Sequence, residues 1–283
     1  MKESVCNFGP GEILSGILTT PDADVAKTDA PTALILNAGI VHRIGPFRLH
    51  VDIARQMARL GYSTLRMDLS GLGESGPRSG RLQSSDRAEL DVADAINFLK
   101  RETNNDQVVL MGLCSGAFNA HKVAAKDSRV VGAVFLDGIV FRTMGYYLRH
   151  RLGRFLKPRF WRNAVKRRLS DLNQSNSASP AISESEFFAD PIPQDQVIRD
   201  LNSMMERGVQ MLFLYTDGYD DICGRIQFKE MFGLQPDQGQ LQVEYYPKSE
   251  HTFRLTENRR TACNRITQWF QSRFTVPSIV VAE

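Results

Sequence analysis

Cys114 lies in a short pattern that is typical of nucleophilic enzymes. In the pattern Gly-Leu-Cys-Ser-Gly at 112–116, one glycine stands two residues before the cysteine and another two residues after it. The pattern follows an apolar run at 107–113 and precedes a small-residue segment at 117–125, so it predicts a sharp strand-to-helix turn that lifts the nucleophile above a sheet. The N–H of Ser115 would then face the negative charge that develops on a substrate carbonyl oxygen.

Two other interpretations of this segment stay open. One is that Cys114 is a small buried core residue, which is the usual place of a free cysteine. The other is that Ser115 is the nucleophile, although the glycine spacing is centred on Cys114. The four cysteines lie far apart without CxxC spacing, so the sequence predicts neither a disulfide framework nor a zinc site. We expect no metal and no tightly bound organic cofactor.

Short apolar runs alternate with amphipathic segments along the chain, which indicates where the nucleophile is held. The runs that predict strands are 33–36, 63–69, 107–113, 130–136, 211–215 and 241–246. Helical spacing of apolar residues predicts the helices between them and a last one that ends near 274. This order predicts an α/β fold with a doubly wound, mostly parallel sheet that is covered by helices on both faces.

A long interruption separates the strand that ends at Leu136 from the strand that begins at Met211. Its first half is basic and aromatic, and its second half is rich in Ser, Asn and Pro. We therefore predict an α/β core formed by 1–140 and 206–283, with 141–205 inserted as a helical lid.

The net charge of +3 is unevenly distributed along the chain. Residues 142–168 hold ten Lys and Arg residues and no Asp or Glu, which leaves the rest of the chain with a formal charge of −7. Because the excess is local, we expect no nucleic-acid partner. On a helix this segment would place an apolar stripe beside a basic one.

Two interpretations of the basic stripe stay open. In one, the apolar face roofs the substrate pocket and the arginines are simply solvated. In the other, Arg149, Arg151 and Arg154 dock an acidic carrier protein or a coenzyme A phosphate, because guanidinium groups suit phosphate. Contact with a membrane surface is less favoured for an interior lid.

The remaining features of the sequence concern where in the cell the protein is found. No apolar run reaches the roughly 18 residues that a membrane span needs. The first sixteen residues lack the long apolar stretch of a secretory signal. Together with the scattered cysteines, these features predict a cytoplasmic protein.

The chain resembles the α/β-hydrolases of the serine-aminopeptidase-like type over nearly its whole length. Asn-Ala-Gly at 37–39 stands where that superfamily has its His-Gly oxyanion loop, and 68–75 matches its D-x-x-G-x-G-x-S segment. More narrowly, 112–114, 147–150 and 159–162 are similar to the hydrolases that accompany exosortase systems.

The resemblance implies the partners of the nucleophile. It places the catalytic base at His251, which follows the last predicted strand. It places the acid about four residues beyond the strand 211–215, where we expect Asp220. The alternative acids are Asp217, Asp221 and, at the end of the preceding strand, Asp137.

The second oxyanion donor is expected on the loop that the resemblance identifies. It would be the backbone N–H of Gly39 or Ile40, beside that of Ser115. The asparagine at 37, in place of the usual histidine, leaves the geometry of this loop open.

These residues predict acyl transfer through a Cys-His-Asp triad. A thiolate beside an imidazolium is a strong nucleophile at neutral pH, and its acyl-enzyme is a thioester. We expect a thioesterase or esterase. The alternatives are an acyltransferase or cyclase that passes the acyl group from a coenzyme A or carrier-protein thioester to an amine or alcohol, and an inactive ligand-binding module with the same fold.

Overall fold

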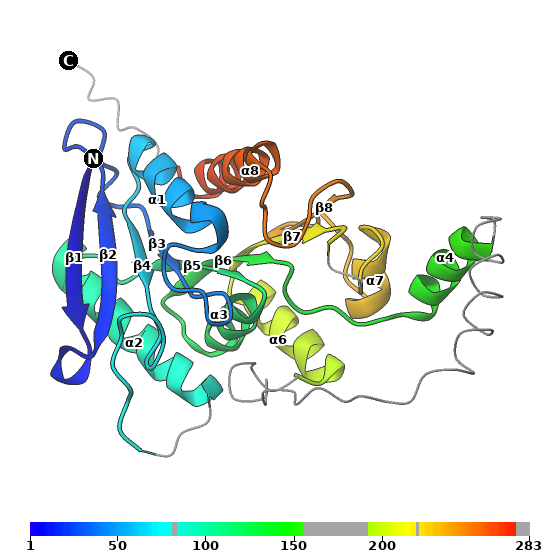
Figure 1. The fold of residues 1–283 in the computed structure, drawn as a ribbon, viewed down its shortest axis with the longest axis horizontal. Coiled ribbons are helices and arrows are strands. Elements are labelled where there is room, and N and C mark those ends of the chain that lie inside the picture. Colours follow the sequence, from blue (N-terminus) through cyan, green and yellow to red (C-terminus); the bar gives the residue numbers. More distant parts are fainter. Residues whose placement is uncertain (81–83, 156–191, 219–220, 276–283) are drawn as a thin grey trace, which may run out of the picture.

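The computed structural model describes residues 1–80, 84–155, 192–218 and 221–275. Its centre is an eight-stranded sheet in the order β1-β2-β4-β3-β5-β6-β7-β8 (Figure 1). The strands are β1 (Lys2–Phe8), β2 (Leu14–Thr20), β3 (Thr32–Ile35), β4 (Thr64–Met67), β5 (Val108–Leu113), β6 (Val130–Leu136), β7 (Gln210–Thr216) and β8 (Leu241–Tyr246). All strands from β4 to β8 in this order pair in parallel, whereas β2 is antiparallel to both of its neighbours.

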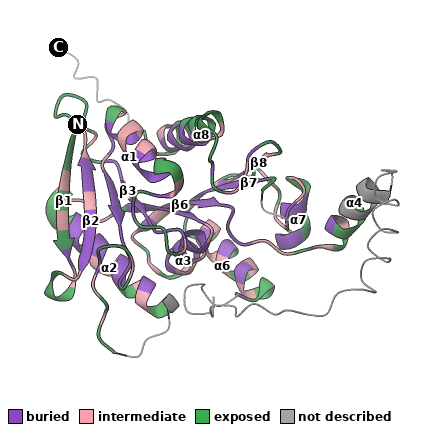
Figure 2. Ribbon diagram, in the orientation of Figure 1, coloured by how far each residue is buried: buried purple, intermediate pink, exposed green. Residues whose placement is uncertain are grey.

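The central strands are apolar because both of their faces are covered. Every residue of β5, with the sequence Val-Val-Leu-Met-Gly-Leu, is buried, and β6 is buried at all but one position. Figure 2 shows these strands as the buried centre of the molecule. Continuous apolar runs of this kind are expected for a parallel sheet between two layers of helices.

Helices cover both faces of the sheet. They are α1 (Leu49–Arg59), α2 (Ser84–Thr103), α3 (Ser115–Lys126), α4 (Met144–Phe155), α6 (Gln194–Glu206), α7 (Ile226–Phe232) and α8 (Thr256–Phe274). One apolar cluster joins α1 and α8 to one face, and a second joins α2, α3, α6 and α7 to the other (Figure 1). The predicted doubly wound, mostly parallel α/β sheet is confirmed.

Two parts of the fold differ from the elements expected from the sequence. The N-terminal residues form the antiparallel pair β1 and β2, which extends the sheet at one edge. Helix α6 overlaps the predicted lid 141–205 over residues 194–205, and its buried residues Val197, Leu201 and Met204 belong to the core cluster beneath the sheet. The basic residues at 156–168 and the rest of the lid up to 191 lie outside the described residues.

The described part of the chain contains no helix that combines the length and the hydropathy of a membrane span.

Candidate active site

The candidate site lies at the carboxyl ends of the parallel strands. Cys114 follows β5, Asp137 follows the adjacent strand β6, and His251 lies in the loop after β8. The N–H of Cys114 donates to the carbonyl of Leu136 at 3.0 Å, and the N–H of Asp137 donates to the carbonyl of Leu214 at 2.8 Å. These bonds continue the sheet past its last regular residues, so neighbouring strands fix the backbone positions of both residues.

Cys114 occupies the sharp turn that its flanking glycines predict. Its φ of 56° and ψ of −119° lie in a region that residues other than glycine rarely adopt, and α3 begins at the next residue. A Cβ on Gly112 would lie 2.2 Å from the backbone of Gly116, and a Cβ on Gly116 would lie 2.3 Å from the carbonyl oxygen of Asn37. Only glycine therefore fits at either position.

Asp137 holds the imidazole of His251. Its carboxylate is fully buried, and Oδ2 lies 2.9 Å from Nδ1 of His251. The same carboxylate accepts hydrogen bonds from the N–H and the hydroxyl of Thr216, both at 2.6 Å. These three contacts keep a buried charge satisfied and fix the orientation of the ring.

The surroundings of His251 favour its charged form. Hydrogen bonds to Asp137 and, secondarily, to Cys114 raise the pKa of His251 from 6.5 to about 10, against the opposing effect of burial. Because Nδ1 bonds to Asp137, Nε2 is the ring nitrogen that can interact with the thiol of Cys114. The structure thus brings the predicted nucleophile and the predicted base together.

The favoured acid of the sequence prediction, Asp220, lies outside the described residues. Asp217 accepts a hydrogen bond from the hydroxyl of Tyr245 at 2.9 Å, and Asp221 accepts one from Arg142 at 2.6 Å. Neither contacts the histidine. The carboxylate on His251 is that of Asp137, which had been only an alternative.

The predicted oxyanion donors lie close to the nucleophile. The N–H of Gly39 donates to Oγ of Ser115 at 2.6 Å, so this donor already has an acceptor. Among the described residues, the N–H of Ile40 has no protein acceptor. Ser115 itself stands at the start of α3, where backbone N–H groups have no partner within the helix.

Asn37 fixes the loop between β3 and α1, in which the sequence predicted the second oxyanion donor. Its side chain is buried, donates to the carbonyl of Val41 and to Asp68, and accepts from the N–H of Leu69. Asp68 also accepts from the backbone and the guanidinium of Arg43. The matched segment 68–75 therefore anchors this loop rather than supplying a reacting group.

Of the other histidines, two are buried. His121 contacts Asp200 at 3.0 Å between α3 and α6. His50 lies at the start of α1, and burial lowers its pKa to about 4. Among the described residues, no group of three His, Cys, Asp or Glu side chains is arranged to hold a metal ion.

The predicted docking residue Arg149 is engaged within the chain. Its guanidinium forms two hydrogen bonds of 2.6 and 2.8 Å with the carboxylate of Glu230 on α7, and its Nε donates to Sγ of Cys223. Arg151 and Arg154 lie on α4, but their side chains are outside the described set.

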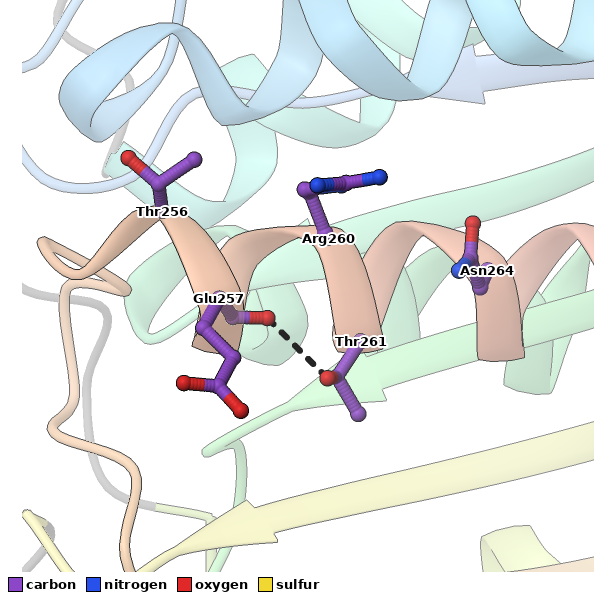
Figure 3. A pocket seen from close by; sticks show the side chains of 5 residues that line it. All are labelled: Thr256, Glu257, Arg260, Thr261 and Asn264. Atoms are coloured by element: carbon purple, nitrogen blue, oxygen red, sulfur yellow. Dashed lines mark hydrogen bonds between the residues drawn. The ribbon is translucent and has the colours of Figure 1, made fainter.

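A pocket away from these groups runs along α8. It is lined by Thr256, Glu257, Arg260, Thr261 and Asn264 (Figure 3). Its hydrogen bond from the Thr261 hydroxyl to the Glu257 carbonyl lies within the helix. Cys114, Asp137 and His251 do not line this pocket.

Comparisons with known proteins agree with this architecture. Residues 33–207 match the family model described as serine aminopeptidase, S33. A Pyrococcus furiosus esterase is similar in structure, with a TM-score of 0.60, 12% identity, and coverage of 97% of this chain and 92% of that chain. An α/β serine hydrolase without a lid from Xanthomonas campestris has a TM-score of 0.58 and 14% identity, with coverage of 98% of this chain and 97% of that chain.

An α/β-hydrolase from a Penicillium species has a TM-score of 0.57 and 17% identity, and it covers 98% of this chain and 100% of its own. At these identities the likeness concerns the fold. No curated protein sequence matches the chain.

Proposed function

We propose that this chain, which belongs to the serine aminopeptidase S33 family, is an acyl-transferring hydrolase with Cys114 as its nucleophile. His251 would be the acid and base, and Asp137 would orient it. The observation that carries the proposal is the hydrogen-bonded series from Thr216 through Asp137 to His251, which ends at the thiol. Covalent catalysis uses this arrangement, in which a nucleophile contacts a base and a third group orients the base.

The raised pKa of His251 suits a cysteine nucleophile. With a pKa of about 10, the imidazole is protonated at neutral pH, and a cation beside the sulfur of Cys114 favours the thiolate. The thiolate attacks the carbonyl carbon of an ester or thioester. The resulting oxyanion accepts hydrogen bonds from the N–H groups of Ser115 and Ile40.

The intermediate then collapses to a thioester on Cys114. The bond to the leaving group breaks, and Nε2 of His251 gives its proton to the departing oxygen or sulfur. The neutral imidazole next takes a proton from water, whose oxygen attacks the thioester carbonyl. The acid leaves, and the thiolate and the imidazolium are restored.

The hydroxyl of Ser115 has a structural role beside the nucleophile. It accepts the N–H of Gly39, which holds the oxyanion loop against the nucleophile turn. This role differs from that of a nucleophile, because the Ser115 oxygen is hydrogen-bonded to the loop, whereas His251 has a hydrogen bond to Cys114.

Kinetics on small esters and thioesters test the proposal. We expect wild-type protein to hydrolyse p-nitrophenyl acetate and the acetyl thioester of N-acetylcysteamine, and Cys114→Ala to lose about 10³-fold or more in kcat/KM. Cys6→Ala is the matched control, because burial raises the pKa of the Cys6 thiol to about 11 and the residue lies on β1.

The products distinguish hydrolysis from transfer. Free acid in the presence of added amines and alcohols supports the hydrolase, whereas amide or ester products identify an acyltransferase that uses the same residues. Equal turnover by wild type and Cys114→Ala, or none by either, contradicts the proposal and favours a binding module.

A further inference from the structure

The loop between β3 and α1 exposes a cluster of apolar side chains. Ile40, Val41, Ile44 and Phe47 are between 36 and 70% exposed. In the described part of the chain, no other eight-residue segment exposes as many large apolar side chains. Single exposed apolar residues are ordinary, but a contiguous group indicates a surface that contacts something apolar.

Hydrogen bonds to buried side chains fix the backbone of this loop. The side chain of Asn37 donates to the carbonyl of Val41, and the backbone N–H of Arg43 donates to Asp68 at 2.6 Å. A Cβ on Gly45 would lie 2.5 Å from the ring of His50, so the loop lies directly on that buried side chain. Arg43 and Gly45 are thus buried in the loop, whereas Ile40, Val41, Ile44 and Phe47 are exposed.

Two residues at the end of the loop are strained. Phe47 and Arg48 have φ values of 48° and 67°, in the left-handed region that favours glycine. Strain of this kind persists where the surrounding contacts enforce it, and it is concentrated at functional positions. Here it accompanies the exposure of a phenylalanine, which is itself unfavourable in water.

The loop that carries the apolar side chains begins next to the candidate site. Gly39, the residue before Ile40, donates its N–H to the side chain of Ser115, which adjoins Cys114. The N–H of Ile40 is also the proposed second oxyanion donor. A substrate carbonyl bound there would have its attached groups beside the side chains of this loop.

We propose that Ile40, Val41, Ile44 and Phe47 bind the hydrocarbon chain of the substrate's acyl group. The inference rests on the proposed function and specifies its substrate class: esters or thioesters of acyl groups longer than acetyl. Each methylene transferred from water to such a surface increases kcat/KM by about fourfold at most, and by less where the contact is partial.

The test compares acyl chain lengths in matched variants. For wild-type protein, we expect kcat/KM to rise over p-nitrophenyl esters from acetate to octanoate. Phe47→Ser and Ile44→Ser should reduce the octanoate value about tenfold or more and leave the acetate value within about twofold. Val5→Ser is the control, because Val5 is 72% exposed on the edge strand β1 and lies outside the loop.

A second readout does not need turnover. Alkylation of Cys114 by N-alkyl iodoacetamides should become faster as the alkyl group lengthens from two to eight carbons, and the loop variants should remove this acceleration. If alkylation shows the chain-length effect but no ester is hydrolysed, the apolar site stands and the proposed function fails.

Other outcomes overturn the inference. If the loop variants show the same chain-length profile as wild-type protein, the proposed acyl site is wrong, even if esters are hydrolysed. The same holds if the variants lower acetate and octanoate rates equally. If they instead abolish sedimentation with phosphatidylcholine vesicles or dimerisation, without changing the profile, the loop contacts a membrane or a second copy.

Discussion

Asp137 gives the candidate site its electrostatic character. The carboxylate is buried, yet all three of its contacts are donors: the N–H and hydroxyl of Thr216 and the imidazole of His251. A carboxylate held in this way stabilises an imidazolium and fixes which ring nitrogen faces the thiol.

Asp137→Asn tests this role directly. The amide removes the largest cause of the raised pKa, so the pKa of His251 should fall from about 10 towards 6.5. Activity at pH 8 should fall about 10²- to 10⁴-fold, because the imidazolium is then largely lost. The measurements are a ¹³C-histidine NMR titration and a pH–rate profile.

Asp217→Asn and Asp220→Asn are the controls for that substitution. Asp217 bonds to Tyr245, and Asp220 is the acid that the sequence favoured. Both variants should keep the wild-type titration of His251. If Asp220→Asn shifts that titration and Asp137→Asn does not, the assignment of Asp137 is wrong.

At the scale of elements, the turn between β5 and α3 needs two glycines. They allow α3 to approach β5 and the backbone of Asn37 without a Cβ in between. The strain at Cys114 is therefore maintained by close backbone packing on both sides of it.

Gly116→Ala should disrupt this turn. Its new methyl group would meet the carbonyl oxygen of Asn37 at 2.3 Å, so one of the two backbones would have to shift. We expect a loss of about 3 kcal/mol in the free energy of unfolding, measured in urea, and loss of activity. Gly76→Ala is the control, because Gly76 has no positive φ and a Cβ there would lie at an ordinary contact distance of 3.6 Å from Ile13. Equal effects in both variants would show that packing at the turn is not the cause.

Helix α4 depends on a different contact, the carboxylate of Glu230. The Glu230 carboxylate accepts hydrogen bonds from Arg149 through both of its oxygens, and one from the hydroxyl of Thr143.

Glu230→Gln should increase amide hydrogen exchange in 144–149 by about three- to tenfold, since a charge-assisted pair is lost. Asp195→Asn, which removes an exposed pair with Arg199 on α6, should leave that segment unchanged. Unchanged exchange in Glu230→Gln would show that this pair does not hold α4.

At the scale of the whole molecule, the pair between His251 and Asp137 links stability to pH. The pKa of about 10 in the folded chain lies above the ordinary value of 6.5, so the folded state binds the proton more tightly. The stabilisation is complete below pH 6.5 and is lost as the pH rises to about 10.

Unfolding in urea at several pH values measures this linkage. The difference in the free energy of unfolding between wild type and His251→Gln should be largest at pH 6 and should shrink by pH 10. A difference that stays constant over this range would mean that the pKa of His251 is not raised by folding.

Much of the fold follows from local signals in the sequence. The apolar strands β5 and β6, and the glycines around Cys114, predicted the sheet and the turn because each depends on neighbouring residues. The edge pair β1 and β2 was not predicted, since only the last residue of β1 is buried and Ser15 and Gly16 interrupt the apolar residues of β2. Most of helix α6 fell within the predicted lid 141–205, because that lid was inferred from the long interval between two predicted strands.

The acid could not be chosen from the sequence for a geometric reason. Several aspartates follow β6 and β7, and the carboxyl ends of neighbouring parallel strands lie at the same edge. Thr216, at the end of β7, directs its N–H and hydroxyl to Asp137. The turn after β7 instead packs its backbone at Gly218 on the loop of His251. The spacing of residues along the chain therefore does not identify which aspartate contacts His251.

The central claim is that Cys114 forms an acyl-enzyme. Its most direct test is peptide mapping by mass spectrometry after wild-type protein and Cys114→Ala are mixed with an acyl thioester and rapidly quenched in acid. We predict the mass of one acyl group on the peptide that contains Cys114, with no adduct on the variant. An adduct on Ser115, or one that persists in Cys114→Ala, would contradict the account.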